Sequence, residues 1–119
     1  MDAGVPSANI IACVDPLGRR IAVRRARWEG HLRTQHPEVA AHVEAVPLTL
    51  EQPDRISSDA DNPDGMNYYR RAALPPPHHR LYLKVCVSFH QRDWSGLFGE
   101  FITAYPTKGV ARDAVQQSP

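Results

Sequence analysis

The stretch Arg27-Trp28-Glu29-Gly30-His31-Leu32-Arg33-Thr34-Gln35-His36-Pro37-Glu38 decides how the chain can fold, because it combines helical spacing with a proline break. Trp28 and Leu32 are four residues apart, so in a helix both face the same way. His31 then lies on the flank of that face, at the border between core and solvent. This spacing predicts a helix over 25–35 that buries one side and carries a histidine at its edge.

A second helix is expected directly after the first. Pro37 disfavours a helical conformation at His36 and suits the first turn of a new helix. The segment that follows repeats an apolar residue with the spacing of a helical stripe, at Val39, Val43 and Val46. The two helices should therefore meet at His36.

From residue 54 onward the pattern alternates, which is typical of strands. The clearest strand is predicted over 80–89, where Leu81, Leu83, Val85, Val87 and Phe89 share one face. Lys84 and Cys86 belong to its other face. Such alternation predicts a sheet with one face under helices and one face open.

Three further strands complete the expected sheet, over 54–58, 66–73 and 98–105. In the last of them, alternation sends Phe98, Ile102 and Ala104 one way and Phe101, Thr103 and Tyr105 the other. The open face would then display Lys84, Thr103 and Tyr105, and His31 could reach the same rim.

The predicted fold class is α+β. Two or three N-terminal helices should pack on one face of an antiparallel sheet of about four strands. A small hairpin is expected before them, because Asp15-Pro16-Leu17-Gly18 suits a turn between two β-rich segments. Residues 1–8 are predicted to be a flexible N-terminus, 9–106 one domain and 107–119 a flexible tail.

Composition limits the function classes. The net charge of the 119 residues is only +1, so no global field indicates nucleic-acid binding. Arginines crowd the N-terminal third, and by itself this local cluster is most simply a solvated face: Arg19, Arg20, Arg24, Arg25, Arg27 and Arg33.

The cysteines and the apolar runs bear on location. Cys13 and Cys86 fall in different expected strands, and a disulfide between them stays an open alternative. The chain has no Cys-x-x-Cys pair, no basic-then-apolar leader and no apolar run of membrane-spanning length. The simplest inference is a cytoplasmic protein with free thiols and no membrane association.

A resemblance to a known family covers the chain from about Arg24 to Pro106. The order of short segments resembles the phage-type branch of the barnase/EndoU/colicin/RelE-like (BECR fold) ribonuclease group. Those segments are Trp28…His31…His36-Pro37-Glu38, Pro53-Asp54-Arg55-Ile56, Tyr68-Tyr69-Arg70, Leu83-Lys84-Val85-Cys86-Val87 and Phe101-Ile102-Thr103-Ala104-Tyr105. The chain departs from that group in a triple proline before the long strand and in its near-neutral charge.

The resemblance implies a metal-independent ribonuclease without cofactor, often a toxin or a nuclease of phages and mobile elements. Its partners would be RNA and, for a toxin, a cognate inhibitor protein. The resemblance also implies that His31, the Tyr69-Arg70 pair, Lys84 and Thr103 occupy the site.

The residue types suit metal-free cleavage of single-stranded RNA by 2′-hydroxyl attack. That chemistry needs a base, an acid, and donors or cations for the charge that grows on phosphate. Histidine titrates near neutral pH, arginine and lysine bind phosphate, and a tyrosine ring can stack on an unpaired base. The expected catalytic residues are His31, Thr103, Lys84 and Arg70, and the expected substrate-binding residues are Tyr69, Tyr105 and His36.

Each of these residues also has a purely structural interpretation, and two other functions stay open. One is a non-catalytic module on the same fold that binds nucleic acid or a partner protein. The other, weaker, is a small-ligand-binding domain. A zinc site built from His31, His36 and His42 is disfavoured, because spacings of five and six do not place two ligands on one helix face.

Overall fold

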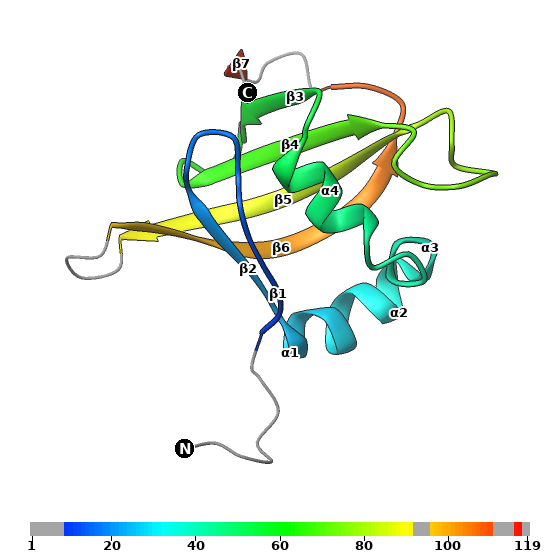
Figure 1. Ribbon diagram of the computed structural model, residues 1–119, viewed down its shortest axis with the longest axis horizontal. Coiled ribbons are helices and arrows are strands. Elements are labelled where there is room, and N and C mark those ends of the chain that lie inside the picture. Colours follow the sequence, from blue (N-terminus) through cyan, green and yellow to red (C-terminus); the bar gives the residue numbers. More distant parts are fainter. Residues whose placement is uncertain (1–8, 92–95, 111–115, 118–119) are drawn as a thin grey trace.

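The computed structural model describes residues 9–91, 96–110 and 116–117. A hairpin of β1 (Asn9–Val14) and β2 (Arg20–Arg24) opens the described chain, and a helical region follows it (Figure 1). That region runs through α1 (Arg25–Arg27), the π-helical turn η1 (Trp28–Leu32), α2 (Arg33–Gln35), α3 (Pro37–Ala40) and α4 (Ala45–Glu51). The remaining strands are β3 (Arg55–Ser58), β4 (Gly65–Arg71), β5 (Tyr82–Gln91), β6 (Leu97–Thr107) and β7 (Gln116–Gln117).

The molecule is α+β, but the predicted proportions are wrong. The described strands form one mixed, seven-stranded sheet in the order β1-β2-β6-β5-β4-β3-β7, and the helices beside it are short. The prediction of helices on a four-stranded antiparallel sheet fails because the hairpin joins the sheet. β2 pairs in parallel with β6, with Arg20 opposite Phe98 and Ala22 opposite Glu100. Short-range periodicity cannot reveal such a long-range pairing.

The predicted turn of the hairpin is confirmed, and it ties the hairpin to the centre of the sheet. The Gly18 amide donates to the Asp15 carbonyl, and Gly18 takes a positive φ of 83°. The buried Asp15 carboxylate accepts the Tyr68 hydroxyl of β4 at 2.5 Å and pairs with Arg19 at 2.7 Å. Burial, followed by this hydrogen bond, raises the pKa of Tyr68. The contact holds the turn over β4.

The predictions of a flexible N-terminus over 1–8 and of a flexible tail over 107–119 concern residues that the structure describes only in part. Residues 1–8, 111–115 and 118–119 lie outside the described residues. Thr107 belongs to β6, and Gln116 and Gln117 pair with Ser57 and Ile56 of β3.

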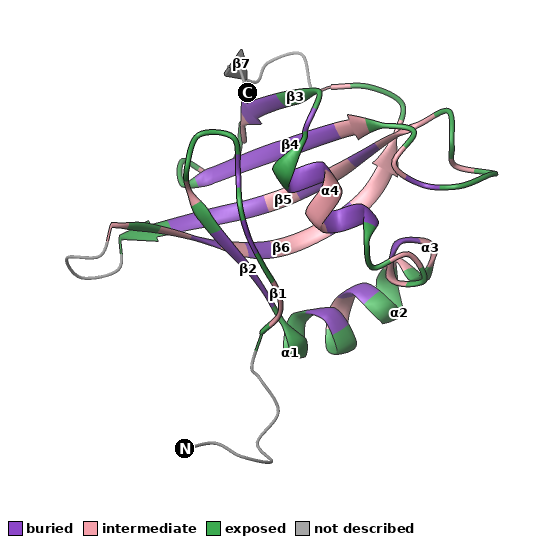
Figure 2. Ribbon diagram, in the orientation of Figure 1, coloured by how far each residue is buried: buried purple, intermediate pink, exposed green. Residues whose placement is uncertain are grey.

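The alternating pattern of the long strand is confirmed. Leu83, Val85, Val87 and Phe89 are buried, and α4 lies over this side of β4 and β5 (Figures 1 and 2). The helix junction is also where the sequence places it: the chain leaves helical geometry at His36 (φ −137°, ψ 65°), and Pro37 begins α3. Val43 corrects the predicted stripe, because it lies between α3 and α4 and is 46% exposed.

The helical region occupies a free edge of β6. β2 pairs with β6 only up to Glu100, and no other described strand pairs with that edge further along. The chain passes directly from β2 into α1 and packs η1 and α3 against β6. Trp28 and Leu32 are buried as predicted, and the Trp28 ring lies 6.2 Å from that of Phe101. This helix therefore straddles a sheet edge, with its apolar side toward the core.

A β-bulge corrects the predicted faces of the last strand. Cys86 of β5 pairs with Thr103, but the next residue, Val87, pairs with Phe101, so Ile102 is an extra residue in β6. A bulge reverses the alternation on one side of it. Phe101 is consequently buried in the core, not on the open face as predicted, whereas Thr103 keeps the predicted side.

Alanine substitutions on the two sides of the bulge test this register. Phe101→Ala is expected to lower the free energy of unfolding by about 3–5 kcal/mol, because it empties a core position. Ile102→Ala should cost less than about 2 kcal/mol, since its side chain is partly exposed. Urea unfolding of both variants measures the difference, and the opposite ranking would mean that β6 has no bulge.

Candidate functional site

A contact between helix and sheet forms the centre of the candidate site. The His31 Nε2 atom lies 3.1 Å from the Thr103 Oγ1 atom. His31 comes from the π-helical turn and Thr103 from the strand directly after the bulge. Both irregularities are enriched near functional sites, because each re-aims a side chain locally. The sequence predicted that these two residues approach one another, and the structure brings them into hydrogen-bond contact.

Three more predicted residues continue from this contact along the open face. The His36 ring stacks on the Tyr105 ring, and the two ring centroids are 5.5 Å apart. The His36 ring also meets the His31 ring edge-on, with 6.2 Å between their centroids. Lys84 hydrogen-bonds Tyr105, and its ammonium lies 5.4 Å from the Tyr105 ring centroid. Two imidazoles, two hydroxyls and one ammonium thus share one side of the sheet.

Lys84 is a cation in this setting. Its partial burial acts to lower the pKa, but the hydrogen bond with Tyr105 and nearby groups outweigh it, so the pKa of Lys84 is raised above its ordinary value. The side chain is therefore protonated at neutral pH. A protonated lysine held by a tyrosine hydroxyl is a point charge suited to an anion.

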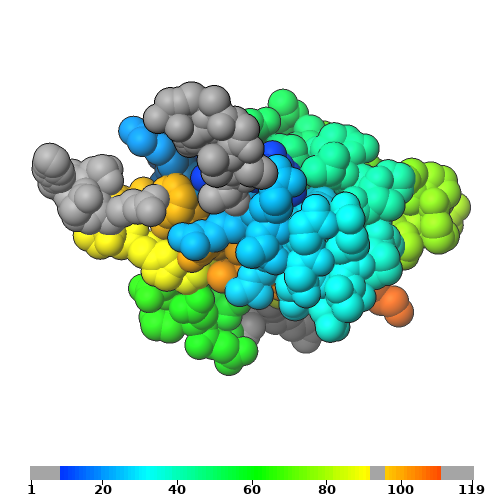
Figure 3. Space-filling model, turned by 90° about the horizontal axis from the view of Figure 1, so that it is seen from below, coloured from blue at the N-terminus to red at the C-terminus, as the bar shows by residue number. Residues whose placement is uncertain are grey.

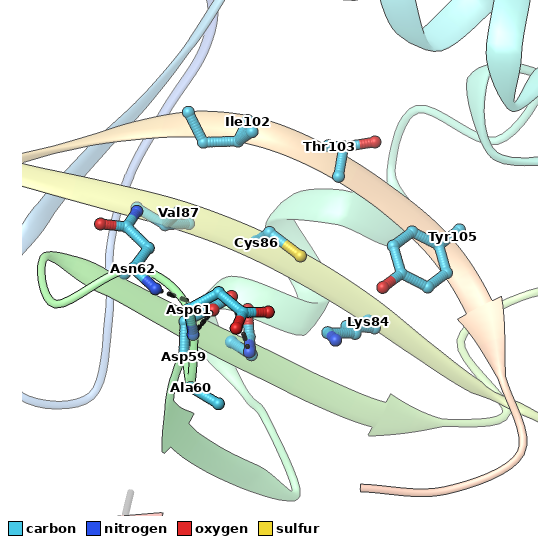
Figure 4. A pocket seen from close by; sticks show the side chains of 12 residues that line it. Asp59, Ala60, Asp61, Asn62, Lys84, Cys86, Val87, Ile102, Thr103 and Tyr105 are labelled. Carbon is cyan, nitrogen blue, oxygen red and sulfur yellow. Dashed lines mark hydrogen bonds between the residues drawn. The ribbon is translucent and has the colours of Figure 1, made fainter. Parts of the chain in front are cut away.

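A hollow of about 560 Å³ opens beside Lys84, and we call it the loop hollow (Figure 4). Lys84, Cys86, Thr103 and Tyr105 form its floor. Residues of the β3–β4 loop and of β4 form its wall: Asp59, Ala60, Asp61, Asn62, Gly65 and Asn67. Its size is in the range of small-molecule sites.

The wall of the loop hollow is ordered by its own hydrogen bonds. The Asp59 carboxylate accepts the backbone amides of Asp61 and Asn62, and Asn67 Nδ2 donates to its second oxygen at 3.4 Å. That bond fixes the Asn67 amide, whose buried Oδ1 has no hydrogen-bond partner among the residues that the structure describes. A buried acceptor without a partner is costly, but this atom lies beneath the surface of the hollow and is not exposed to a ligand.

A second hollow of about 450 Å³, the helix hollow, is lined by His31, whereas its partner Thr103 lines the loop hollow. Arg24, Ala26, Arg27, Gly30, His31, Glu100 and Phe101 line it. Glu100 pairs with Arg24 at 2.6 Å and lies 3.6 Å from His90. Figure 3 shows β6 in orange between the blue-to-cyan helical region and the green β3–β4 loop. The His31–Thr103 pair thus stands between two hollows.

Two predicted site residues are not placed where they could contact a substrate here. Arg70 is on the opposite face of β4, opposite buried Leu83, and its guanidinium donates to the Gln52 carbonyl at 2.6 Å. Tyr69 lies beneath Lys84, whose ammonium is 5.8 Å from its ring centroid. Tyr69 is fully buried, which leaves no ring face for a base. The Tyr69 hydroxyl has no hydrogen-bond partner among the described residues.

Sequence reasoning missed the residues that form the walls. Asp59 and Asp61 fall between two predicted strands, and Asn67 and Glu100 fall within predicted strands, without any pattern that marks them as site residues. The loop composition alone carried no further signal. For Asn67 one indication was usable: it is two residues from Tyr69 in the predicted strand over 66–73, and strand alternation places such residues on the same side.

A comparison of the chain with family models, curated proteins and solved structures finds no significant match.

None of the described helices has the length and apolar character needed to cross a bilayer. Within the described residues, no group of three or more His, Cys, Asp or Glu side chains is arranged to hold a metal ion. Cys13 and Cys86 are both free thiols.

The reactivity of Cys86 tests whether its thiol is buried in the floor of the loop hollow. Burial, with a smaller effect of Asp59, raises its pKa from 9.0 to about 11 although Lys84 opposes this. Because only the thiolate reacts, alkylation by iodoacetamide at pH 8 should be about 100-fold slower than for a free thiol with the ordinary pKa.

Mass spectrometry of the Cys86 peptide measures this rate as the pH changes. The rate should rise about tenfold per pH unit up to about pH 11. A rate that levels off near pH 9 would mean that the thiol is not buried as described.

Proposed function

We propose that the protein is an endoribonuclease that cleaves single-stranded RNA by attack of a ribose 2′-hydroxyl on the adjacent phosphodiester. The observation that carries the proposal is the 3.1 Å contact between His31 Nε2 and Thr103 Oγ1, with Lys84 and Tyr105 on the same face. The contact joins an imidazole, a side chain that can take up or release a proton, to a hydroxyl group beside a cation.

The reaction needs two proton transfers. A base takes the proton of the 2′-hydroxyl, the 2′-oxygen attacks phosphorus, and the bond from phosphorus to the 5′-oxygen breaks. The leaving 5′-oxygen takes up a proton, and a 2′,3′-cyclic phosphate remains. His31 is assigned to proton transfer because it is partly exposed, lines the helix hollow and contacts Thr103 of the loop hollow.

The growing negative charge on phosphate requires donors and cations. Thr103 and Tyr105 supply hydroxyl groups two residues apart on one strand face, and Lys84 supplies the positive charge. His36 is assigned to support, because it stacks on Tyr105 and contacts His31. Arg70 and Tyr69 have no part in the proposal.

The loop hollow is assigned to a nucleotide next to the cleaved bond. It adjoins Thr103, and its wall includes the exposed Asp61, whose carboxylate can accept the N–H groups of a base. Tyr105 presents a partly exposed ring at its floor, and base–aromatic stacking is a common mode of single-strand recognition.

The proposal takes RNA as partner and the cytoplasm as location, where thiols such as Cys13 and Cys86 remain reduced. A role as a toxin of a phage or mobile element, with a cognate inhibitor protein, belongs to the same proposal and rests on the family resemblance alone.

Cleavage of labelled RNA by purified protein in EDTA tests the proposal. His31→Ala should lower kcat/KM about 10²- to 10⁴-fold, as expected for the loss of a proton-transfer group. Thr103→Val should lower it about 10- to 100-fold, because it removes the hydroxyl and keeps the shape. Circular dichroism and thermal melting should show an intact fold for both variants.

Two variants serve as matched controls. His42→Ala removes a histidine that lies away from both hollows, near Glu44, and should keep the parent rate. Thr103→Ser restores the hydroxyl and should recover most of the activity. If His31→Ala cleaves at the parent rate, or if the protein binds RNA without cutting it, the nuclease assignment is wrong.

A further inference from the structure

The helix hollow has no role in the chemistry assigned above, although His31 is one of its lining residues. Its lining combines Arg27 with the Arg24–Glu100 ion pair. Because that pair is internally neutral, the fixed charge left in the hollow is the single positive charge of Arg27. Arg27 is exposed and has no ion pair with any described residue.

Arg33, another exposed arginine of the helical region, differs from Arg27 in this respect. Arg33 pairs with Glu29 at 2.9 Å and does not line the hollow. Arg27 and His31 are four residues apart on one helical segment, so they share a side of it. An anion bound at Arg27 would therefore lie about one helical turn from the His31 imidazole.

Gly30 keeps the hollow open between these residues. It lies in the π-helical turn without a positive φ, and a Cβ atom added there would meet nothing within 4 Å. The absence of a side chain is therefore not required by packing. It leaves the space of about 450 Å³ unfilled next to His31.

We propose that the helix hollow binds the RNA backbone beyond the cleaved bond, with Arg27 on a neighbouring phosphate, so that the protein selects oligonucleotides over dinucleotides. The direction in which the RNA strand crosses the protein rests on the proposed function. The strand would pass from the loop hollow across His31 and Thr103 into the helix hollow. Arginine suits this position because its planar fork donates two hydrogen bonds to one phosphate.

The length dependence of cleavage tests the inference. The kcat/KM for an RNA hexamer, divided by that for a dinucleotide, should be about ten or more in the parent protein. Arg27→Gln should lower this ratio about tenfold, because a charged hydrogen bond to the extra phosphate is lost. Arg33→Gln, which makes the same charge change on the same helical segment, should leave the ratio unchanged.

Gly30→Leu offers a second variant that changes no charge. A Cβ atom at this position meets nothing within 4 Å, and Gly30 lines the hollow, so a leucine side chain should occupy part of the space and the ratio should fall as it does for Arg27→Gln. Gly30→Ala is the matched control and should cause a smaller fall. Cleavage of both substrates with a ratio that neither Arg27→Gln nor Gly30→Leu lowers would overturn the inference and leave the nuclease assignment standing.

Binding of an uncleavable 2′-O-methyl RNA hexamer separates the inference from the chemistry. Fluorescence anisotropy at several salt concentrations gives the slope of log K against log[salt]. Arg27→Gln should reduce the magnitude of this slope by about 0.7, the value for one phosphate contact of a single strand, and Arg33→Gln should not. An equal slope in parent and Arg27→Gln proteins would contradict the site even if RNA is cleaved. A lower slope without any cleavage would support the backbone site and contradict the proposed nuclease.

Discussion

The short parallel pairing of β2 with β6 governs the arrangement of everything around the candidate site. Because the pairing stops at Glu100, the rest of that edge of β6 is available to another element. The chain leaves β2 directly into the helical region, which fills the edge. A helix beside a sheet edge can present side chains to both faces. Here Trp28 and Leu32 pack on the core side, and His31 reaches the open side.

Two local irregularities complete this arrangement. In a regular strand Phe101 and Thr103 would face the same way, because they are two residues apart. The bulge at Ile102 places them on opposite faces, so that Phe101 packs in the core and Thr103 faces the open side. The π-helical turn carries His31 on the opposing element. Regular versions of both elements would satisfy the backbone equally well. Their coincidence at one hydrogen bond is the main physical reason to interpret this place as a functional site.

The sequence allowed some of this to be predicted, in a physically understandable way. Local periodicity identified the strand with Lys84, the buried pair of Trp28 and Leu32, and the break at His36. It could not reveal the parallel pairing or the bulge, because these depend on contacts distant in the sequence. For Tyr69 and Arg70, the resemblance assigned both residues to one site, whereas neighbours on a strand point to opposite faces.

A crystal structure with an uncleavable 2′-deoxy dinucleotide tests the central claim most directly. The account predicts that the phosphate lies within hydrogen-bond distance, about 3 Å, of His31 Nε2 or Thr103 Oγ1, with a base in the loop hollow. A dinucleotide bound elsewhere on the protein, with the His31–Thr103 contact untouched, would contradict it.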